Sequence, residues 1–435
     1  MQNAGRLLAP RLLWGPCEPP SSAAAPGQSG PKTFRAKRDS LVWAVAGWKP
    51  ALQNARFDIP DENASLVAKY GSTSLLARRM KFLAHEKTLL LAAVAAIVFG
   101  IYEHSLLSAG SAVLWGAFIL LFGVIIATSM RVAHHAEVLA HRLGEPYGTM
   151  ILTISAVVVE VVMLVILMSG SHSPTLARDT VYSAVMLDVN GILGLAAIMG
   201  GMRHGEQEYN LDSAHSYIAM LLVAIGIAMF IPEFIQPSAW HAYSIFTIAI
   251  TVLLYFAFLR IQTAEHRYFF EFPYDVPKDE EHHGDSGIWI HVGLLIVSVI
   301  VIGVLAEYLS AFLEHGMQGS SLPLALPAVL VALVSASPEI LTALRAARAD
   351  RMQTAINIAL GASLATVLLT IPVIEAYALF TGDRIEMAMT PLQTAMVALT
   401  LFAALISLHD GETNVLEGAV HFSLFLTFVV LMFVA

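Results

Sequence analysis

Charged residues are scarce in this 435-residue chain, in which Asp, Glu, Lys and Arg together make up 13%. Soluble domains carry about 25% charged residues, so the composition excludes an ordinary soluble globular protein. Hydrophobic residues make up 57% instead, which is typical of an integral membrane protein. Cys17 is the single cysteine, and this excludes an intramolecular disulfide framework. The formal net charge of -9 gives no indication of a nucleic-acid partner, because the acids lie mostly in loops and tails.

Apolar runs of membrane-spanning length are missing from residues 1–85. This part is basic and holds a stretch rich in Pro, Ser and Ala, from Pro19 to Gly27. Such a composition is typical of linkers and does not supply a packed core. We therefore predict a disordered N-terminal extension, with Met80 as the natural beginning of the folded protein.

From residue 88 onward, apolar runs of about 20 residues alternate with short polar loops, and a helix of this length spans a bilayer. We predict about eleven such helices in an all-α polytopic membrane protein. They lie near 88–103, 106–130, 148–169, 179–201, 215–235, 241–260, 288–312, 322–344, 354–378, 388–408 and 415–434.

Basic residues favour one set of alternate loops over the other. The second set holds only Arg178 and Arg384, whereas the first holds Arg131, Arg142, Arg203, Arg260, Arg267, Lys278, Arg345, Arg348 and Arg351. The positive-inside rule then predicts that the first set and the N-terminus are cytoplasmic, and the odd helix number places Ala435 outside. We expect a multi-pass protein of the inner (cytoplasmic) membrane, embedded in the lipid bilayer, and the sequence leaves its oligomeric state open.

Two related stretches each carry one deeply placed carboxylate. Residues 144–160 begin polar, become apolar and end on Glu160, and residues 327–339 end on Glu339. An acidic residue at membrane depth costs about 2.5–3.5 kcal/mol on insertion scales, so such a residue indicates a functional site. No Lys or Arg in either half is placed to pair with these carboxylates inside the bilayer. Glu160 and Glu339 are therefore the candidate cation- and proton-binding residues.

The features around these carboxylates recur in the same order in both halves. Ala-Glu-x-Leu precedes each of them, at 136–139 and 306–309, and Asn-x-x-x-Gly follows, at Asn190 and Asn357. With five helices in each half, the second copy enters the membrane from the opposite side. This is the inverted-topology repeat of secondary transporters, whose site lies at the midplane between the repeats.

The repeat divides the chain into segments. We expect the first membrane helix over 86–104, the first repeat over 105–260 and the second over 288–435. Between the repeats, residues 261–287 form a predicted cytoplasmic linker rich in acids and His. Its acids and histidines lack regular metal-ligand spacing, which favours a solvated linker over a cation sensor.

Further polar residues complete the candidate site. Thr153, Ser155, Ser335 and Ser337 lie close to the two carboxylates in sequence and are candidate ligands. Pro338 removes a backbone hydrogen bond, and we expect the freed carbonyl to turn toward a cation.

Two pairs of polar residues keep two interpretations each, and the role of one further acid stays open. Asn190 and Asn357 suit either ligation or hydrogen bonds between helices. Glu137 and Glu307 lie nearer helix ends, where a proton relay and a capping or snorkelling role are both open. Asp188 is an intramembrane acid without a counterpart in the second half, and its role stays open, an auxiliary role being one interpretation.

Residues 85–435 resemble the calcium:cation antiporter superfamily, and specifically its bacterial Cha-type calcium (sodium, potassium)/proton antiporters. The resemblance lies in Ala136-Glu137, in Gly144-Glu-Pro-Tyr-Gly-Thr149 before Glu160, in Ser337-Pro-Glu339, and in Asn357-Ile-Ala-Leu-Gly-Ala-Ser363. It implies two repeats whose glutamates, here Glu160 and Glu339, bind a cation and exchange it for protons. No cofactor is implied beyond the transported cation.

The chain departs from relatives specialised for calcium, many of which have Gly-Asn three and four residues before each glutamate. Ala156-Val157 and Ser335-Ala336 stand at these positions. Calcium generally takes six to eight oxygen ligands, and the missing amides leave fewer. Sodium and potassium therefore stay open beside calcium.

We expect a secondary transporter in which protons and a cation compete for one pair of buried carboxylates. Two other classes of membrane protein are alternatives. A cation channel is disfavoured because no filter-like glycine loop is visible. A membrane-embedded metal-dependent hydrolase is disfavoured because the sequence from His135 to His141 is not His-Glu-x-x-His. The protein is thus expected not to be an enzyme.

Overall fold

The computed structural model describes residues 86–143, 147–171, 173–272, 287–318 and 320–434. The predicted N-terminal extension, the Gly144-Glu-Pro segment and most of the predicted linker lie outside the described residues. Within them, ten helices are long and apolar enough to cross a membrane, and Pro391–Ser407 is a shorter apolar helix. Together they correspond to the eleven helices predicted from the sequence, and the all-α fold is confirmed.

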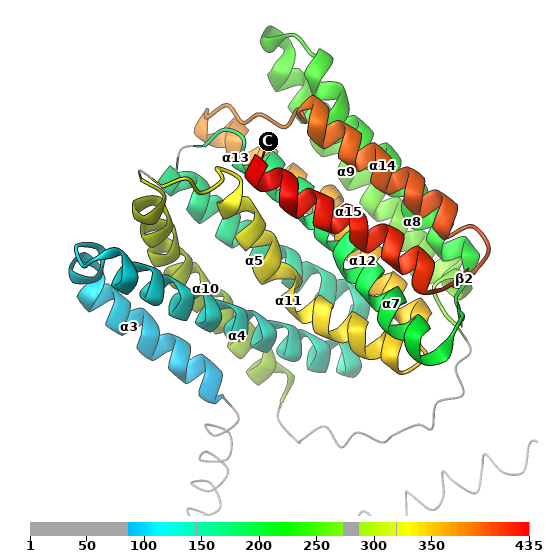
Figure 1. Cartoon of the computed structure of the whole chain (residues 1–435), viewed down its shortest axis with the longest axis horizontal. Coiled ribbons are helices and arrows are strands. Elements are labelled where there is room, and N and C mark those ends of the chain that lie inside the picture. The colour runs from blue at the N-terminus through cyan, green and yellow to red at the C-terminus, as the bar shows by residue number, and fades with distance from the viewer. Residues whose placement is uncertain (1–85, 144–146, 172, 273–286, 319, 435) are drawn as a thin grey trace, which may run out of the picture. The chain divides into compact units, whose positions relative to one another are not determined.

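The helices follow one another through short loops (Figure 1). Their bounds are α3 (Lys87–Leu107), α4 (Ser111–Leu143), α5 (Tyr147–Ser171), α6 (Leu176–Val185), η1 (Met186–Ile192), α7 (Leu193–His204), α8 (Leu211–Ile225), η2 (Gly226–Phe230), η3 (Ile231–Phe234), η4 (Pro237–Ala239), α9 (Trp240–Arg260), η5 (Ile261–Glu265), η6 (Arg267–Phe269), α10 (Ile288–Met317), α11 (Leu326–Arg348), α12 (Met352–Ala365), η7 (Thr366–Thr370), α13 (Ile371–Thr381), α14 (Pro391–Ser407) and α15 (Val415–Val434). Four of the η segments, η1, η2, η5 and η7, are π-helical turns.

Contacts between loops fix the direction in which each helix runs. At one end, which we call the closed end (loops 171–176, 234–237 and 381–391), the Glu386 amide donates to the Pro174 carbonyl at 2.8 Å. At the other, the open end (loops 204–211, 348–352 and 407–415), β1 (Gln207–Glu208) pairs antiparallel with β2 (Glu412–Thr413). The span α6–η1–α7 therefore runs from the closed end to the open end, whereas α12–η7–α13 runs the opposite way. Equivalent spans of the two halves are thus inverted.

The packing of the two halves follows the same inversion. In the second half α15 packs against α7, and in the first half α9 packs against α13. The α7–α15 contact is close because a Cβ on Gly194 would come within 2.7 Å of the Phe422 backbone nitrogen. Small residues of this kind let membrane helices approach each other. The extra helix α3 lies outside both repeats, against α4 and α10.

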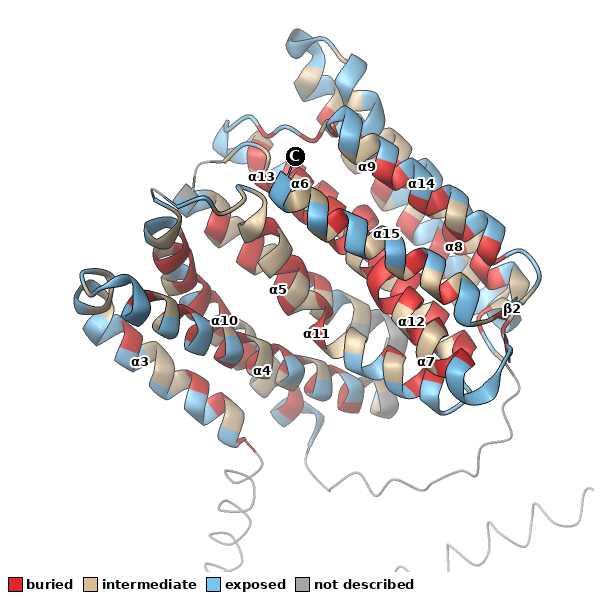
Figure 2. Cartoon of the chain, in the orientation of Figure 1, coloured by how far each residue is buried: buried red, intermediate tan, exposed pale blue. Residues whose placement is uncertain are grey.

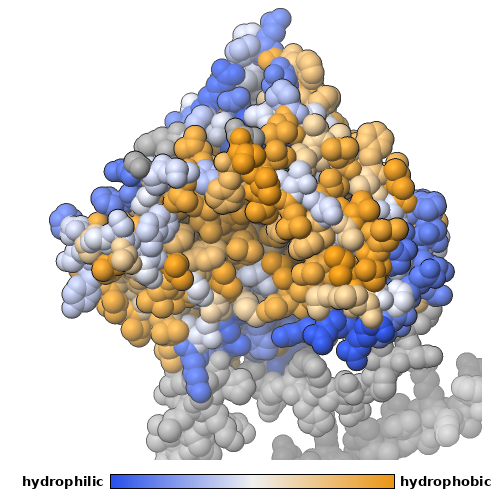
Figure 3. Space-filling model, viewed as in Figure 1, coloured by the Kyte–Doolittle hydropathy of each residue, from blue (hydrophilic) through white to orange (hydrophobic). Residues whose placement is uncertain are grey.

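The two spans that contain η1 and η7 form the interior of the bundle. In the most apolar 18 residues of each span, 83% of the residues are buried in 176–204 and 67% in 352–381. The corresponding share is 17% in α3 and in α15 (Figure 2). The outward faces are apolar, and in Figure 3 hydrophobic residues cover the middle of the face while hydrophilic residues gather along its lower edge. Lipid therefore contacts the outer helices, and polar chemistry is concentrated on the inner ones.

The first part of the predicted linker 261–287 is helical. The helix expected to end at residue 260 continues through η5 to Glu265, and η6 follows. Phe270 is 8% exposed and packs edge-on against the rings of Tyr217 and Phe258. An aromatic residue of this size gains from burial, so residues 261–272 belong to the folded body rather than to a solvated segment.

Candidate functional site

Glu160 and Glu339 lie on two packed helices, α5 and α11, and both face a cavity of about 420 Å³. We call it the central cavity. Its polar lining residues are Ser129, Glu137, Thr153, Glu160, Asp188, Tyr217, Tyr255, Gln262, Thr263, Arg267, Glu271, Ser335, Glu339, Thr342, Thr354, Asn357 and Thr366. Arg267 and Glu271 are more than half exposed, so the cavity reaches solvent at the open end. The two glutamates singled out in the sequence thus line the same cavity.

Glu160 is 2% exposed, and one of its oxygens is held by hydroxyl groups of the other half. Its Oε2 accepts hydrogen bonds from Thr366 at 2.9 Å and Thr370 at 3.0 Å, the first and last residues of η7. Its Oε1 has no hydrogen-bond partner among the described residues. A buried carboxylate with an unused oxygen beside a cavity is suited to receive a cation or a proton.

Asp188 adds a third carboxyl group from the π-helical turn η1. It is 2% exposed, its Oδ2 accepts a 3.0 Å hydrogen bond from Ser363, and its Oδ1 is unpartnered within the described part of the chain. Asp188, Glu160 and Glu339 all line the central cavity. π-Helical turns inside α-helices are frequent at functional sites, and here one in each half points polar groups at the same cavity. Asp188 is therefore a third carboxyl group at the cavity that Glu160 and Glu339 line.

Pro338 frees a backbone carbonyl, as expected, but the carbonyl is already used. Proline at 338 cannot donate to the carbonyl of Val334, four residues earlier. That oxygen instead accepts from Ser337 at 2.8 Å and from Ser129 of α4 at 3.1 Å. The expectation that it turns toward a cation is not met in this conformation, because two hydroxyl groups occupy it. Ser337 thereby satisfies the carbonyl that Pro338 leaves without its helical donor. It does not line the central cavity.

The other predicted ligands fall into two groups. Thr153, Ser335 and Asn357 line the central cavity. The hydroxyl of Ser155 donates to the Ile151 carbonyl of its own helix, and Ser155 is not among the lining residues. The Asn357 amide donates to the Phe270 carbonyl at 2.8 Å, which fastens the folded part of the linker beside the cavity.

Asn190 lies away from the cavity. Its amide donates to Thr400 at 2.7 Å, and its carbonyl oxygen lies 3.1 Å from His421. These contacts join η1 to α14 and α15, so of the two open interpretations the structure fits hydrogen bonding between helices. Asn190 lies in the π-helical turn in the middle of its span, whereas Asn357 lies near the start of its span. The shared Asn-x-x-x-Gly pattern therefore does not mark equivalent positions.

The two candidate relays also differ. Glu137 lines the central cavity near its exposed rim. Glu307 is exposed on α10 and lines neither described cavity. Of these two residues, Glu137 is the one that lies between solvent and the buried carboxylates.

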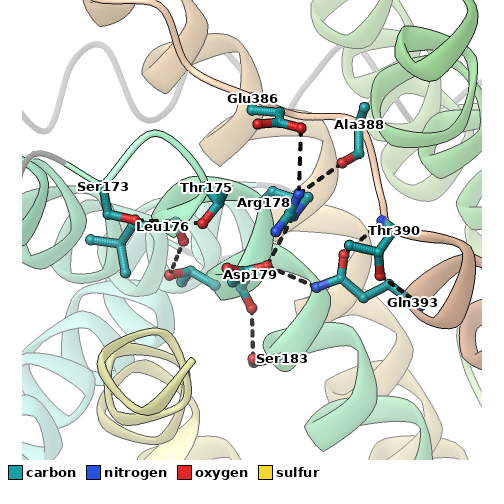
Figure 4. A network of polar contacts seen from close by, with 11 residues as sticks. Ser173, Thr175, Leu176, Arg178, Asp179, Ser183, Glu386, Ala388, Thr390 and Gln393 are labelled. Carbon is teal, nitrogen blue, oxygen red and sulfur yellow. Dashed lines mark hydrogen bonds and ion pairs between the residues drawn. The ribbon is translucent and has the colours of Figure 1, made fainter. Parts of the chain in front are cut away.

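At the closed end a polar network joins the first half to the second (Figure 4). Arg178 pairs with Asp179 at 2.9 Å and donates to the Ala388 carbonyl at 3.1 Å. Gln393 donates to Asp179 at 2.8 Å. The start of α6 is thus fastened to the loop before α14, and this loop covers the end opposite to the mouth of the central cavity.

Several site residues escaped the sequence analysis. Thr366 and Thr370 are polar residues at i and i+4 in an apolar segment, and this spacing was the available signal. Glu375 is 3% exposed in the same span, and its position inside a predicted membrane helix was signal enough. The π-helical turns that aim these residues have no simple sequence pattern.

A metal-enzyme arrangement does not form in the described part of the chain. No three His, Cys, Asp or Glu side chains there are arranged to hold a metal ion together. His135 begins the stretch from His135 to His141 that was compared with a zinc-hydrolase motif. Its side chain is 1% exposed and contacts His291 and Glu86.

Comparisons with known proteins point in one direction. The family described as sodium/calcium exchanger protein matches residues 113–264 and 290–434. The putative ionic transporter y4hA of Sinorhizobium fredii is 35% identical over 319 residues, which cover 72% of this chain and 86% of that protein. The sodium-potassium/proton antiporter ChaA of Escherichia coli is 34% identical over 317 residues, which cover 71% of this chain and 86% of that protein.

A solved structure has the same fold. The structure of the selenium-substituted Ca2+/H+ antiporter protein YfkE matches with a TM-score of 0.64 and 22% sequence identity, over 80% of this chain and 100% of the other. This likeness concerns the arrangement of the helices.

Proposed function

The chain belongs to the sodium/calcium exchanger protein family, and on that basis we propose that it is a cation/proton antiporter that works through Glu160 and Glu339. The relatives at about a third identity are named as an ionic transporter and a sodium-potassium/proton antiporter, which supports transport rather than an enzymatic reaction. The observation that carries the site assignment is the unpartnered Oε1 of buried Glu160, beside a cavity that Glu339 also lines.

Protons and the cation compete for the same oxygens. Burial disfavours an ionised carboxylate, so without a cation the pair holds protons. A bound cation favours the ionised form and displaces them. The hydroxyl groups of Thr366 and Thr370 donate to Glu160 and thereby support its ionised state. Each cycle exchanges cation charge for the protons that the carboxylates release.

Exchange without leakage requires that the site open to one face at a time. The central cavity reaches solvent at the open end, where Glu271 is exposed, while the network around Arg178 holds the closed end. This arrangement is the form open to one face, and it disfavours a channel, which needs a continuous path. Inverted repeats supply the second form, because each half can adopt the arrangement of the other.

The oxygen-rich polar lining around the two glutamates fits hard cations. Carboxylates and hydroxyls suit Ca²⁺, Na⁺ and K⁺ and are poor ligands for softer metals. Glu160 and Glu339 supply two carboxylates, and Asp188 lines the same cavity. One divalent ion or two monovalent ions balance two ionised carboxylates, and we propose all three cations as substrates to be tested.

Basic residues indicate which face the open end meets. The positive-inside rule assigns the end rich in Lys and Arg to the cytoplasm. Among the described residues, Arg178 and Arg384 lie near the closed end. Those near the open end are Arg131, Arg142, Arg203, Arg260, Arg267, Arg345, Arg348 and Arg351. We propose a cytoplasmic open end, a location in the cytoplasmic membrane and Ala435 on the outer side.

Everted membrane vesicles test the function. Respiration acidifies their interior, and a pH-sensitive dye then reports proton release on addition of calcium, sodium or potassium chloride. Vesicles with the protein should release protons with at least one of these salts, and vesicles from cells with an empty vector should not. Equal responses of the two vesicle types to all three salts would reject proton-coupled exchange of these cations.

A further inference from the structure

Glu375 on α13 is a buried carboxyl group that the exchange site does not use. Its side chain is 3% exposed, and its Oε2 has no hydrogen-bond partner among the described residues. No basic side chain of the described chain forms an ion pair with it. A buried acid with an unpaired oxygen and no ion-pair partner is costly in a folded protein, so a purely structural role gives no reason for it.

The surroundings of Glu375 connect it to solvent at the closed end. It lines a small cavity of about 70 Å³ together with Tyr243 of α9, Arg384 and Glu386. Water occupies about 30 Å³ per molecule in the liquid, so this cavity has room for water. The Glu386 side chain is 57% exposed and belongs to the loop that covers this end. Tyr243, Arg384 and Glu386 are the titratable groups that face the cavity beside Glu375.

The same span connects Glu375 to the central carboxylates. Thr370, which donates to Glu160, precedes it by five residues, about 7.5 Å of helical rise. The central cavity reaches along this span as far as Thr366, and the small cavity begins at Glu375. The two cavities therefore lie toward opposite ends of this span, and Glu375 is a titratable group on the closed side of Thr370.

We propose that Glu375 is a proton relay that serves the closed end. It takes the proton that leaves Glu160 when this end opens, and passes it to water in the small cavity, or carries it in the reverse direction. The proton moves between carboxyl groups and water, and no other bond changes. The inference rests on the proposed cation/proton exchange, and it assigns the relay of this face to a residue other than Glu307.

The test separates proton movement from cation movement in vesicles reconstituted with the full-length protein. Radiolabelled sodium, or calcium if that is the cation exchanged by the wild type, measures exchange of cation against unlabelled cation, which needs no net proton transfer. A pH-sensitive dye measures proton-coupled exchange in the same vesicles. Glu375→Gln keeps the size of the side chain and removes its exchangeable proton. Glu386→Gln, an exposed acid of the same cavity, is the matched control.

Glu375→Gln should lower proton-coupled exchange by about a hundredfold, which is within the usual contribution of a positioned acid or base, and should leave cation–cation exchange close to wild type. Glu375→Asp should restore part of the proton flux, and Glu386→Gln should behave as wild type. Loss of both fluxes in Glu375→Gln would overturn the proposal in favour of a structural role. Retention of both fluxes would overturn it as well. Failure of the exchange function itself differs from these outcomes, because the wild type would then show no cation-driven proton flux.

Discussion

Gln393 at the start of α14 donates a hydrogen bond to the carboxylate of Asp179 at the start of α6. The same oxygen, Oδ1, also accepts from the guanidinium of Arg178. One carboxylate oxygen therefore joins the two halves of the protein at the closed end. The side chains of Arg178 and Asp179 are only 9% and 14% exposed, so this contact is shielded from water and stronger than a surface ion pair.

Asp179→Asn should weaken the closed end. Asparagine keeps an accepting oxygen but carries no charge, so the contact falls from about 1.5–3 kcal/mol to about 0.5–1.5 kcal/mol, and the population open at this end should rise by roughly fivefold to tenfold. An Ala388→Cys reporter in a Cys17→Ser background measures this population as the rate of labelling by a thiol reagent. Glu386→Gln is the control, because Glu386 lies 4.0 Å from Arg178 and is largely exposed. Equal labelling rates in Asp179→Asn and the parent would show that the network does not hold this end closed.

Glu160→Gln and Glu339→Gln should each abolish cation-dependent proton release while the protein still reaches the membrane. Glutamine keeps the volume of the side chain but exchanges no proton and carries no charge for a cation. The measurement is dye-reported proton release in everted vesicles, with immunoblotting of the membranes. Glu233→Gln, a change at an exposed acid outside both cavities, should leave the signal intact. Substantial exchange in either mutant would remove that glutamate from the site.

Thr366→Val and Thr370→Val should each weaken cation binding. Each removes a hydroxyl that donates to Glu160 Oε2, and hydrogen bonds to charged groups contribute about 1.5–3 kcal/mol, so the cation KM should rise by roughly tenfold or more. Thr251→Val is a matched control, since this buried hydroxyl bonds only to the backbone of its own helix. A KM that changes no more than in the control would mean that the hydroxyls do not support the ionised carboxylate.

Much of this architecture is predictable from hydropathy and composition. The length of the apolar runs gives the helices, because each run must satisfy its backbone hydrogen bonds within the membrane. The cost of a buried charge then marks Glu160 and Glu339 without any structural information. The expected inversion also follows from the number of helices in each half.

The finer arrangement of the site was less accessible to sequence reasoning. Asn190 and Asn357 stand in the same short pattern, but the first faces α14 and α15 and the second faces the cavity. A π-helical turn rotates the residues around it relative to a regular helix, so the facing of Asn190 and Asp188 does not follow from helical spacing. The partners of the Val334 carbonyl could not be predicted either, since Ser129 comes from a distant helix.

Glu137 and Glu307 give the last prediction, because they occupy matching places in the sequence and different places in the structure. Glu137 lines the rim of the central cavity, whereas Glu307 lines neither described cavity. A relay needs a titratable group between bulk water and a desolvated carboxylate, and a cation ligand instead acts on affinity directly. Glu137→Gln should therefore slow proton entry from the open end and alter the pH profile measured there, with the cation KM nearly unchanged.

Glu307→Gln serves as the comparison for this prediction, and its profiles should match the wild type on both faces. Exchange is measured in reconstituted vesicles while the pH is varied on one side at a time. Unchanged profiles in Glu137→Gln would reject the relay, and lower expression with a normal pH dependence would indicate a helix cap. A large rise in KM would make Glu137 a cation ligand instead. Altered proton access in Glu307→Gln alone would place the relay of one face on α10, where the exposed position of Glu307 gives no path to the central carboxylates.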